Sequence, residues 1–175
     1  MNGDLSGVRD FDFLIGKWRV RHQTLAERLK GATEWREAMA IDVVRPAFAG
    51  LGNVGCFLRE VDEQPFGGIP IRLYDPTIGL WRIYWLDSLG QRMEPPVVGG
   101  FRDGEGLFEG DDELRGRPIR VRYTWSDVSD HAARWTQSYS PDEGRTWELN
   151  SIMTFSRDNS LPDVPVFPLP TLEIS

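Results

Sequence analysis

The sequence predicts an all-β protein that forms a single closed antiparallel barrel of about ten strands. Seven tryptophans, nine phenylalanines and four tyrosines occur beside 18 glycines and 12 prolines, a mixture of strand-forming and turn-forming residues that is typical of β-rich chains. Short runs in which polar and apolar residues alternate are separated by turn residues about every 8–12 positions. The pattern contains neither the long helices that a doubly wound fold needs between strands nor a repeat of fixed period.

Residues that favour turns bound the predicted strands. Residues 75–79, 103–106 and 140–144 each place proline or glycine where a hairpin needs a preset or positive φ. Consecutive strands should therefore pair antiparallel. The predicted strands are residues 17–24, 33–45, 53–61, 69–74, 80–87, 97–102, 107–111, 118–125, 133–140 and 146–156. Helix-forming residues occur over only two short stretches, residues 11–15 and 25–30.

The length of 175 residues fits one folded domain. We expect an N-terminal extension at residues 1–10, the barrel domain at residues 11–157 and a proline-rich tail at residues 158–175. The end of this tail, residues 161–175, alternates four prolines with apolar side chains. We therefore expect an extended segment that docks on the barrel or on a second copy of the chain, which makes the protein a monomer or a homodimer.

Composition and charge exclude several classes of function. A formal net charge of −7 disfavours binding to a phosphate backbone, so no nucleic-acid partner is expected. No stretch is apolar for the roughly 18 residues of a membrane span, and the first residues lack the pattern of an export signal, so we expect a cytoplasmic protein. The single cysteine, Cys56, excludes an intramolecular disulfide. The carboxylates at residues 103–113 are interpreted as the exposed side chains of a solvated acidic hairpin, so no metal site is predicted. No cofactor is predicted either.

Strand alternation predicts the side chains that line the barrel and bind a ligand. In residues 33–45 the apolar row contains one carboxylate, Glu37, and in residues 17–24 the inner row contains His22. The same alternation places Trp147 in the inner row of residues 146–156. The predicted ligand-binding residues are His22, Trp35, Glu37, Met39, Tyr123, Trp135, Gln137 and Trp147.

His22 has several possible roles. Beside Glu37 in an apolar cavity, it could form an acid–base pair, anchor a ligand or bind a metal. A hydrogen-bonded pair without chemistry is the simpler interpretation. A lone inward histidine could also be an axial haem ligand, which is the one cofactor alternative.

One segment resembles a known superfamily. The sequence FDFLIGKW at residues 11–18 places Gly16-Lys17-Trp18 where a short turn enters the first strand, and it resembles the calycin superfamily that includes lipocalins. The likeness extends over about residues 11–157 to a bacterial lipocalin-like family of unknown function. It rests on the segments LYDPTIGLWRIYWLDS, PPVVGGF, RPIRVRYTWSD and RWTQSYSPDEGRTW.

The resemblance implies a calycin-type barrel in which Trp18 packs across the closed end beneath an arginine, either Arg134 or Arg157. An indole ring offers apolar area and a face that attracts a guanidinium, so such a pair seals the barrel without burying a bare charge. The resemblance implies no established activity and no catalytic residues.

Two further motifs lie in predicted loops. Residues 140–147 match the Ser-x-Asp-x-Gly-x-Thr-Trp pattern of sialidase propellers, but a single copy in a short chain indicates a structural turn. Residues 86–96 form a polar connection long enough to be a lid, with Asp87, Arg92 and Met93 as candidates for ligand contact.

Three hypotheses about function follow from these observations. The first is the binding of a small, largely apolar molecule inside the barrel. The second is an enzyme, of cyclase, isomerase or decarboxylase type, that acts on a small metabolite near His22 and Glu37. The third is a structural or interaction module whose barrel is filled by its own side chains.

Overall fold

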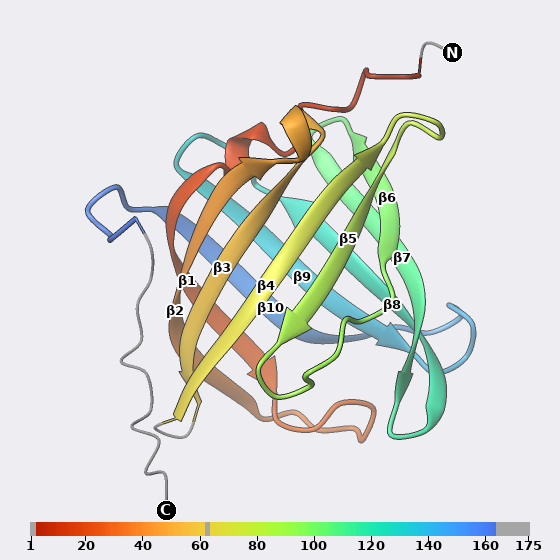
Figure 1. Ribbon diagram of the computed structural model, residues 1–175. Coiled ribbons are helices and arrows are strands. Elements are labelled where there is room, and N and C mark those ends of the chain that lie inside the picture. The colour runs from red at the N-terminus through yellow and green to blue at the C-terminus, as the bar shows by residue number, and fades with distance from the viewer. Residues whose placement is uncertain (1–2, 62–63, 164–175) are drawn as a thin grey trace, which may run out of the picture.

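Ten antiparallel strands close into one barrel, which confirms the predicted fold class (Figure 1). The structure, a computed structural model, describes residues 3–61 and 64–163. The strands are β1 (Gly16–Leu25), β2 (Trp35–Ala47), β3 (Gly52–Val61), β4 (Gln64–Asp75), β5 (Leu80–Asp87), β6 (Val97–Arg102), β7 (Glu105–Leu114), β8 (Arg117–Ser126), β9 (Ala132–Ser140) and β10 (Glu148–Arg157). Each strand pairs with its neighbours in the chain, and β1 pairs with β10 to close the barrel.

Helical structure is confined to two short 3₁₀ turns within the described ranges. The first, η1 (Asp12–Leu14), lies inside the predicted stretch 11–15, and the second, η2 (Phe48–Gly50), was not predicted. The stretch 25–30 forms a turn and not a helix, because Leu29 and Gly31 take positive φ angles of 56° and 69°. Nowhere in residues 3–61 and 64–163 is there a helix long and apolar enough to cross a membrane.

Arg157 and Trp18 seal one end of the barrel. Trp18 is 0% exposed, and its Nε1–H donates to the carbonyl of Leu14 at 2.8 Å. The Arg157 guanidinium carbon lies 4.2 Å from the centre of the Trp18 ring, so Arg157 and not Arg134 takes the place that the resemblance left open. Arg157 also donates to the carbonyls of Phe13, at 2.6 Å, and Ile15, at 2.8 Å. The guanidinium therefore ties the N-terminal segment to the last strand.

An aromatic cluster fills the barrel behind this seal. The Phe11 ring meets Trp81 and Phe101 edge to face, with ring centres 5.0 Å apart in both pairs. Phe108 and Trp125 complete the cluster at 5.6 and 5.8 Å from Phe11. In Figure 1 the N-terminal segment crosses the upper end of the barrel, so this end is plugged by the chain itself.

The prediction placed the wrong row of β2 side chains inside the barrel. Ala40, Asp42 and Val44 are buried inside the barrel, whereas Met39 is 59% exposed. The reason is the pairing register, in which Val20 of β1 faces Ala40, since paired residues lie on the same face of a sheet. The row that begins at Trp35 and contains Glu37 and Met39 therefore points outward.

A β-bulge alters the face pattern of β10. The register with β9 shifts between Leu149 and Ser151, so that Asn150 and Ser151 are both buried. Met153 and Phe155 point inward as predicted. Residues before the bulge are on the opposite face from the predicted one, which places Trp147 outside the barrel.

The beginning of the C-terminal tail packs against the outside of the barrel. Leu161 is buried, and its carbonyl accepts a hydrogen bond of 2.7 Å from the Lys17 ammonium group. Asp163 pairs with Lys17 and with Arg45, each at 3.0 Å. Residues 164–175, and most of the docking that we predict for 161–175, lie outside the described residues.

Candidate functional site

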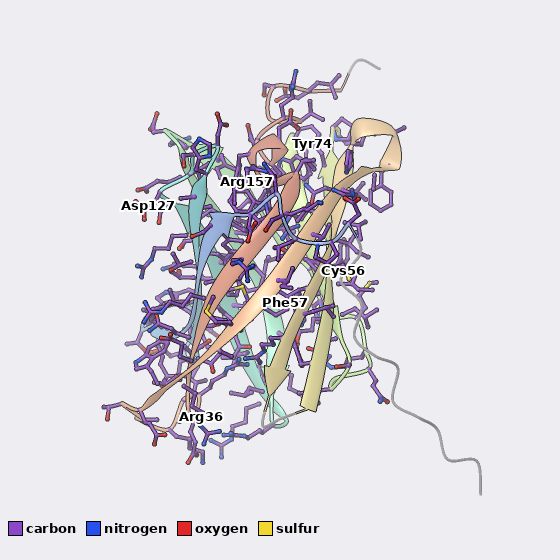
Figure 2. The ribbon with its side chains drawn as sticks, turned by 90° about the vertical axis from the view of Figure 1, so that its left-hand side faces the viewer. Arg36, Cys56, Phe57, Tyr74, Asp127 and Arg157 are labelled. Atoms are coloured by element: carbon purple, nitrogen blue, oxygen red, sulfur yellow. The ribbon has the colours of Figure 1, made fainter. Side chains whose placement is uncertain are left out.

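A cavity of about 240 Å³ occupies the barrel between the aromatic cluster and the end opposite Trp18. Aromatic side chains form its walls. On one side the Phe57 and Trp85 rings meet at 5.9 Å, and Phe66 stacks on Trp85 at 6.4 Å. Across the barrel, on β8 and β9, Tyr123 and Trp135 pack edge to face at 4.9 Å. Figure 2 shows Phe57 between the Arg157 end and the Arg36 end of the barrel.

Glycine in β4 makes room for the Trp85 ring. A Cβ atom on Gly68 would collide with the six-membered ring of the Trp85 indole. The indole can therefore lie against the strand, where it lines the cavity. Its Nε1–H donates to Asp87 Oδ2 at 2.7 Å, which fixes the orientation of the ring.

Four of the eight predicted ligand-binding residues line this cavity. They are His22, Tyr123, Trp135 and Gln137. Their strands, β1, β8 and β9, have the predicted inner faces. Whether they contact a ligand remains a prediction.

The other four residues lie on the outer surface, so their predicted inward orientation was wrong. Trp35 and Met39 are exposed, and Glu37 pairs with Arg21 at 2.6 Å. Trp147 packs outside the barrel, where the Arg122 guanidinium carbon lies 3.8 Å from its ring centre. The causes are the register of β2 and the bulge in β10.

His22 contacts a hydroxyl group and not a carboxylate. Its Nε2 lies 2.8 Å from Ser151 Oγ, and both residues are buried in the cavity wall. Burial, with smaller effects from the positive charges of Arg59 and Arg28, lowers the pKa of His22 to about 3. The imidazole is therefore neutral at pH 7 and is a weak base, suited to hydrogen bonding more than to proton transfer.

A polar group that sequence reasoning missed lies at the inner end of the cavity. Asp42 and Arg72 are 1% and 4% exposed, and Arg72 Nη1 donates to Asn53 Oδ1 at 2.9 Å. Burial raises the pKa of Asp42 to about 6, against the opposing effect of the Arg72 charge. Burial also lowers the pKa of Arg72 to about 10. The signal available in the sequence was one aspartate in the Ala38, Ala40 and Val44 row of β2.

The connection between β5 and β6, residues 88–96, borders the open end of the cavity. Asp87 Oδ1 accepts hydrogen bonds from the backbone N–H groups of Leu89, at 2.9 Å, and Gly90, at 2.6 Å, so the segment begins in a defined turn. Asp87, Leu89 and Glu94 line the cavity. Burial, with nearby carboxylates, raises the pKa of Glu94 to about 7.

Two of the three residues proposed for this connection point elsewhere. Arg92 forms an ion pair of 3.5 Å with Asp112, and neither Arg92 nor Met93 lines the cavity. Only Asp87 is placed as the sequence predicted. Leu89 and Glu94 are the additional residues that the structure brings to the cavity.

The Ser140–Trp147 motif forms a structural turn outside the cavity. Asp142 accepts hydrogen bonds from the Thr146 backbone N–H at 2.8 Å and from its hydroxyl at 2.6 Å. The Trp147 Nε1–H donates to the carbonyl of Gly144 at 2.9 Å. The two hydrogen bonds from Thr146 are the main reason that the pKa of Asp142 is lowered to about 2.

Comparisons with known proteins identify the fold. No family model matches the chain, and no curated protein matches its sequence. The structure is similar to that of the S-type phycobiliprotein lyase CPES from Guillardia theta, with a TM-score of 0.55 and 11% identity over 86% of this chain and 91% of that one. A structure of EF1p2_mFAP2b bound to DFHBI matches with a TM-score of 0.48 and 13% identity, over 87% of this chain and 100% of that one. The likeness to the lyase agrees with the closed ten-stranded barrel described above, so the chain has a lipocalin- and calycin-like barrel fold.

Proposed function

We propose that the protein binds a small, largely apolar molecule inside its barrel. One observation carries the proposal: an aromatic-walled cavity of about 240 Å³ coincides with buried polar atoms that have no partner. Seven buried side-chain polar atoms in the described residues lack a hydrogen-bond partner, and five belong to cavity-lining residues. They are His22 Nδ1, Asp42 Oδ1, Arg59 Nε, Arg72 Nε and Trp125 Nε1. Their concentration around one space favours a binding site over scattered packing defects.

Such an arrangement costs stability when the barrel is empty. Protein interiors are close-packed, and a cavity forfeits the contacts that its lining would otherwise make. A buried polar group without a partner costs about 1–3 kcal/mol. A ligand that fills the space restores the missing contacts and offsets the first cost.

The walls favour a flat, conjugated ligand. Phe57, Phe66 and Trp85 lie on one side of the barrel, and Tyr123 and Trp135 lie on the other. Flat ring systems pack well between aromatic side chains by stacking or edge contacts. Polar groups at the inner end, Asp42 and Arg72, would orient such a molecule.

The other two hypotheses receive less support. A cavity of this size argues against a barrel filled by its own side chains. The acid–base pair of the enzyme hypothesis does not form, because Glu37 lies outside the barrel and pairs with Arg21.

We further propose, from the segments quoted above, that the chain is a member of the bacterial lipocalin-like family.

A titration with a neutral fluorescent probe tests the proposal. N-phenyl-1-naphthylamine, which becomes fluorescent in apolar surroundings, should bind the wild-type protein. Met153→Trp should weaken its binding by about tenfold or more, because the larger side chain fills the cavity. Thr154→Trp is the matched control, since Thr154 is the exposed neighbour on the same strand.

The proposal fails if the probe does not bind, or if both tryptophan variants bind it as well as the wild type does. Urea unfolding of each variant verifies that the fold is intact. A native mass spectrum of protein from its own host would then identify a retained natural ligand.

A further inference from the structure

Two arginines lie close enough at the open end of the cavity for their charges to interact. Arg28 lies in the β1–β2 turn, and Arg59 lies on β3; both line the cavity. Burial and the positive charge of Arg28 lower the pKa of Arg59. In the part of the chain that the structure describes, neither guanidinium has a carboxylate oxygen within 4.0 Å. A partly buried pair of like charges is unfavourable unless a negative group lies nearby.

Aromatic side chains hold the two guanidinium groups in place. The Arg59 guanidinium carbon lies 4.7 Å from the centre of the Phe66 ring. That of Arg28 lies 5.4 Å from the Tyr139 ring centre, and its Nη1 donates to the Tyr139 hydroxyl at 3.3 Å. A guanidinium has five N–H donors, so one bond to Tyr139 leaves most of those on Arg28 for another acceptor.

The nearby carboxylates are engaged in other contacts or partly neutral. Asp87 accepts hydrogen bonds from the Trp85 indole and from two backbone N–H groups. Asp112 pairs with Arg92. Because the pKa of Glu94 is raised to about 7, much of this carboxyl group is protonated at neutral pH. The charge of Asp87 raises the pKa of Arg59 and so offsets part of the positive charge. Two arginines against Asp87 and a partly protonated Glu94 still leave a local positive charge at the mouth, in a protein whose net charge is −7.

We propose that Arg28 and Arg59 bind the oxyanion head group of the ligand, which makes that ligand an amphipathic organic anion. The flat apolar body lies between the aromatic walls, and the head group lies at the mouth. An oxyanion there accepts charge-assisted hydrogen bonds from both guanidiniums and removes their repulsion. This inference rests on the proposed binding function and adds the charge and orientation of the ligand.

Two probes that differ by one charged group test the inference. 8-Anilinonaphthalene-1-sulfonate has the ring system of N-phenyl-1-naphthylamine with an added sulfonate. Arg59→Gln and Arg28→Gln should each weaken binding of the sulfonate probe by about tenfold or more, the effect of losing a charge-assisted hydrogen bond. Binding of the neutral probe should weaken by clearly less, because that probe has no charged group for the guanidinium to bind, and urea unfolding shows that each variant is folded.

Arg102→Gln is the control for net charge. Arg102 is exposed on β6 beside Phe101 of the aromatic cluster, and it does not line the cavity. Its loss should leave both affinities within about twofold, because salt screens a solvated charge at the other end of the barrel.

The outcomes separate the two proposals. If the neutral probe binds and the Arg28 and Arg59 variants bind the sulfonate probe as tightly as the wild type, the anion site is refuted and cavity binding stands. An equal loss in the Arg102 variant would also refute the site, since the effect would then be one of overall charge. If neither probe binds the wild type, the proposed function fails, and this inference fails with it.

Discussion

Replacement of Trp18 by alanine tests the closed end of the barrel. Trp18 is 0% exposed and meets Phe155 edge to face at 6.0 Å, so the change opens a cavity that the two strands cannot readily close. Removal of a large buried aromatic side chain costs about 3–5 kcal/mol. The carbonyl of Leu14 also loses the 2.8 Å hydrogen bond from the indole, which costs about 1 kcal/mol. We therefore expect a loss near the upper end of that range.

The loss is measured by urea unfolding followed by far-ultraviolet circular dichroism, because a tryptophan fluorescence signal would change with the substitution itself. Trp35→Ala is the matched control. Trp35 is 38% exposed on the outer face of β2, so its loss should lower the free energy of unfolding by only about 1 kcal/mol or less. Trp18→Phe should fall between the two, because it keeps a ring and loses the indole N–H.

A loss below about 1 kcal/mol for Trp18→Ala would refute the reasoning. It would mean that the indole and the Arg157 guanidinium do not seal the barrel end. Equal losses for Trp18→Ala and Trp35→Ala would contradict the assigned faces of β1 and β2.

Two further predictions concern backbone strain and buried charge. Gly16→Ala should lower the free energy of unfolding by about 1–3 kcal/mol, because Gly16 has φ of 131° and a Cβ there would collide with Arg157 Nη1; unchanged thermal unfolding would contradict this. Asp42 has its pKa raised from 3.8 to about 6, so the folded state binds a proton that the unfolded state has released, and stability falls as pH rises through that window. At about 1.4 kcal/mol per pKa unit the fall is about 3 kcal/mol. Asp42→Asn should abolish this fall in the free energy of unfolding, measured by urea unfolding between pH 4 and 7. Equal pH slopes for the wild type and the variant would be inconsistent with a buried carboxyl group.

Much of the fold could be predicted because its signals are local. Turn residues between short alternating runs specify antiparallel neighbours, and β1, β8 and β9 each have one clearly apolar row. The β2 strand lacks this contrast. Its two rows both contain apolar residues, and the larger ones, such as Met39 and Ile41, are in the outer row. The pairing of Val20 with Ala40 decides which row of β2 points inward. This pairing register cannot be read from the residues of β2 alone.

The charged residues of the candidate site were harder to predict for the same reason. Arginines alternate with apolar residues on β1 and β8 and point outward there, so nothing local marks Arg59 and Arg72 as inward. A guanidinium is tolerated inside only where partners from other strands meet it. Arg72 meets Asn53 from β3 and the rings of Phe11 and Trp125, and Arg59 meets Phe66 from β4. These contacts exist only in the closed barrel.

The Trp18–Arg157 seal and the cavity lining differ in how fully their polar groups are satisfied, and this difference separates stability from binding. At the closed end, Arg157 donates to backbone carbonyls and covers Trp18, so the guanidinium is matched within the protein. Among the residues that line the cavity, Asp42, Arg59 and Arg72 each keep a buried polar atom without a partner among the described residues. Groups that are matched within the fold stabilise it, whereas unmatched buried groups lower its stability. A ligand that fills the cavity and bonds to the polar groups that face it should therefore raise the free energy of unfolding.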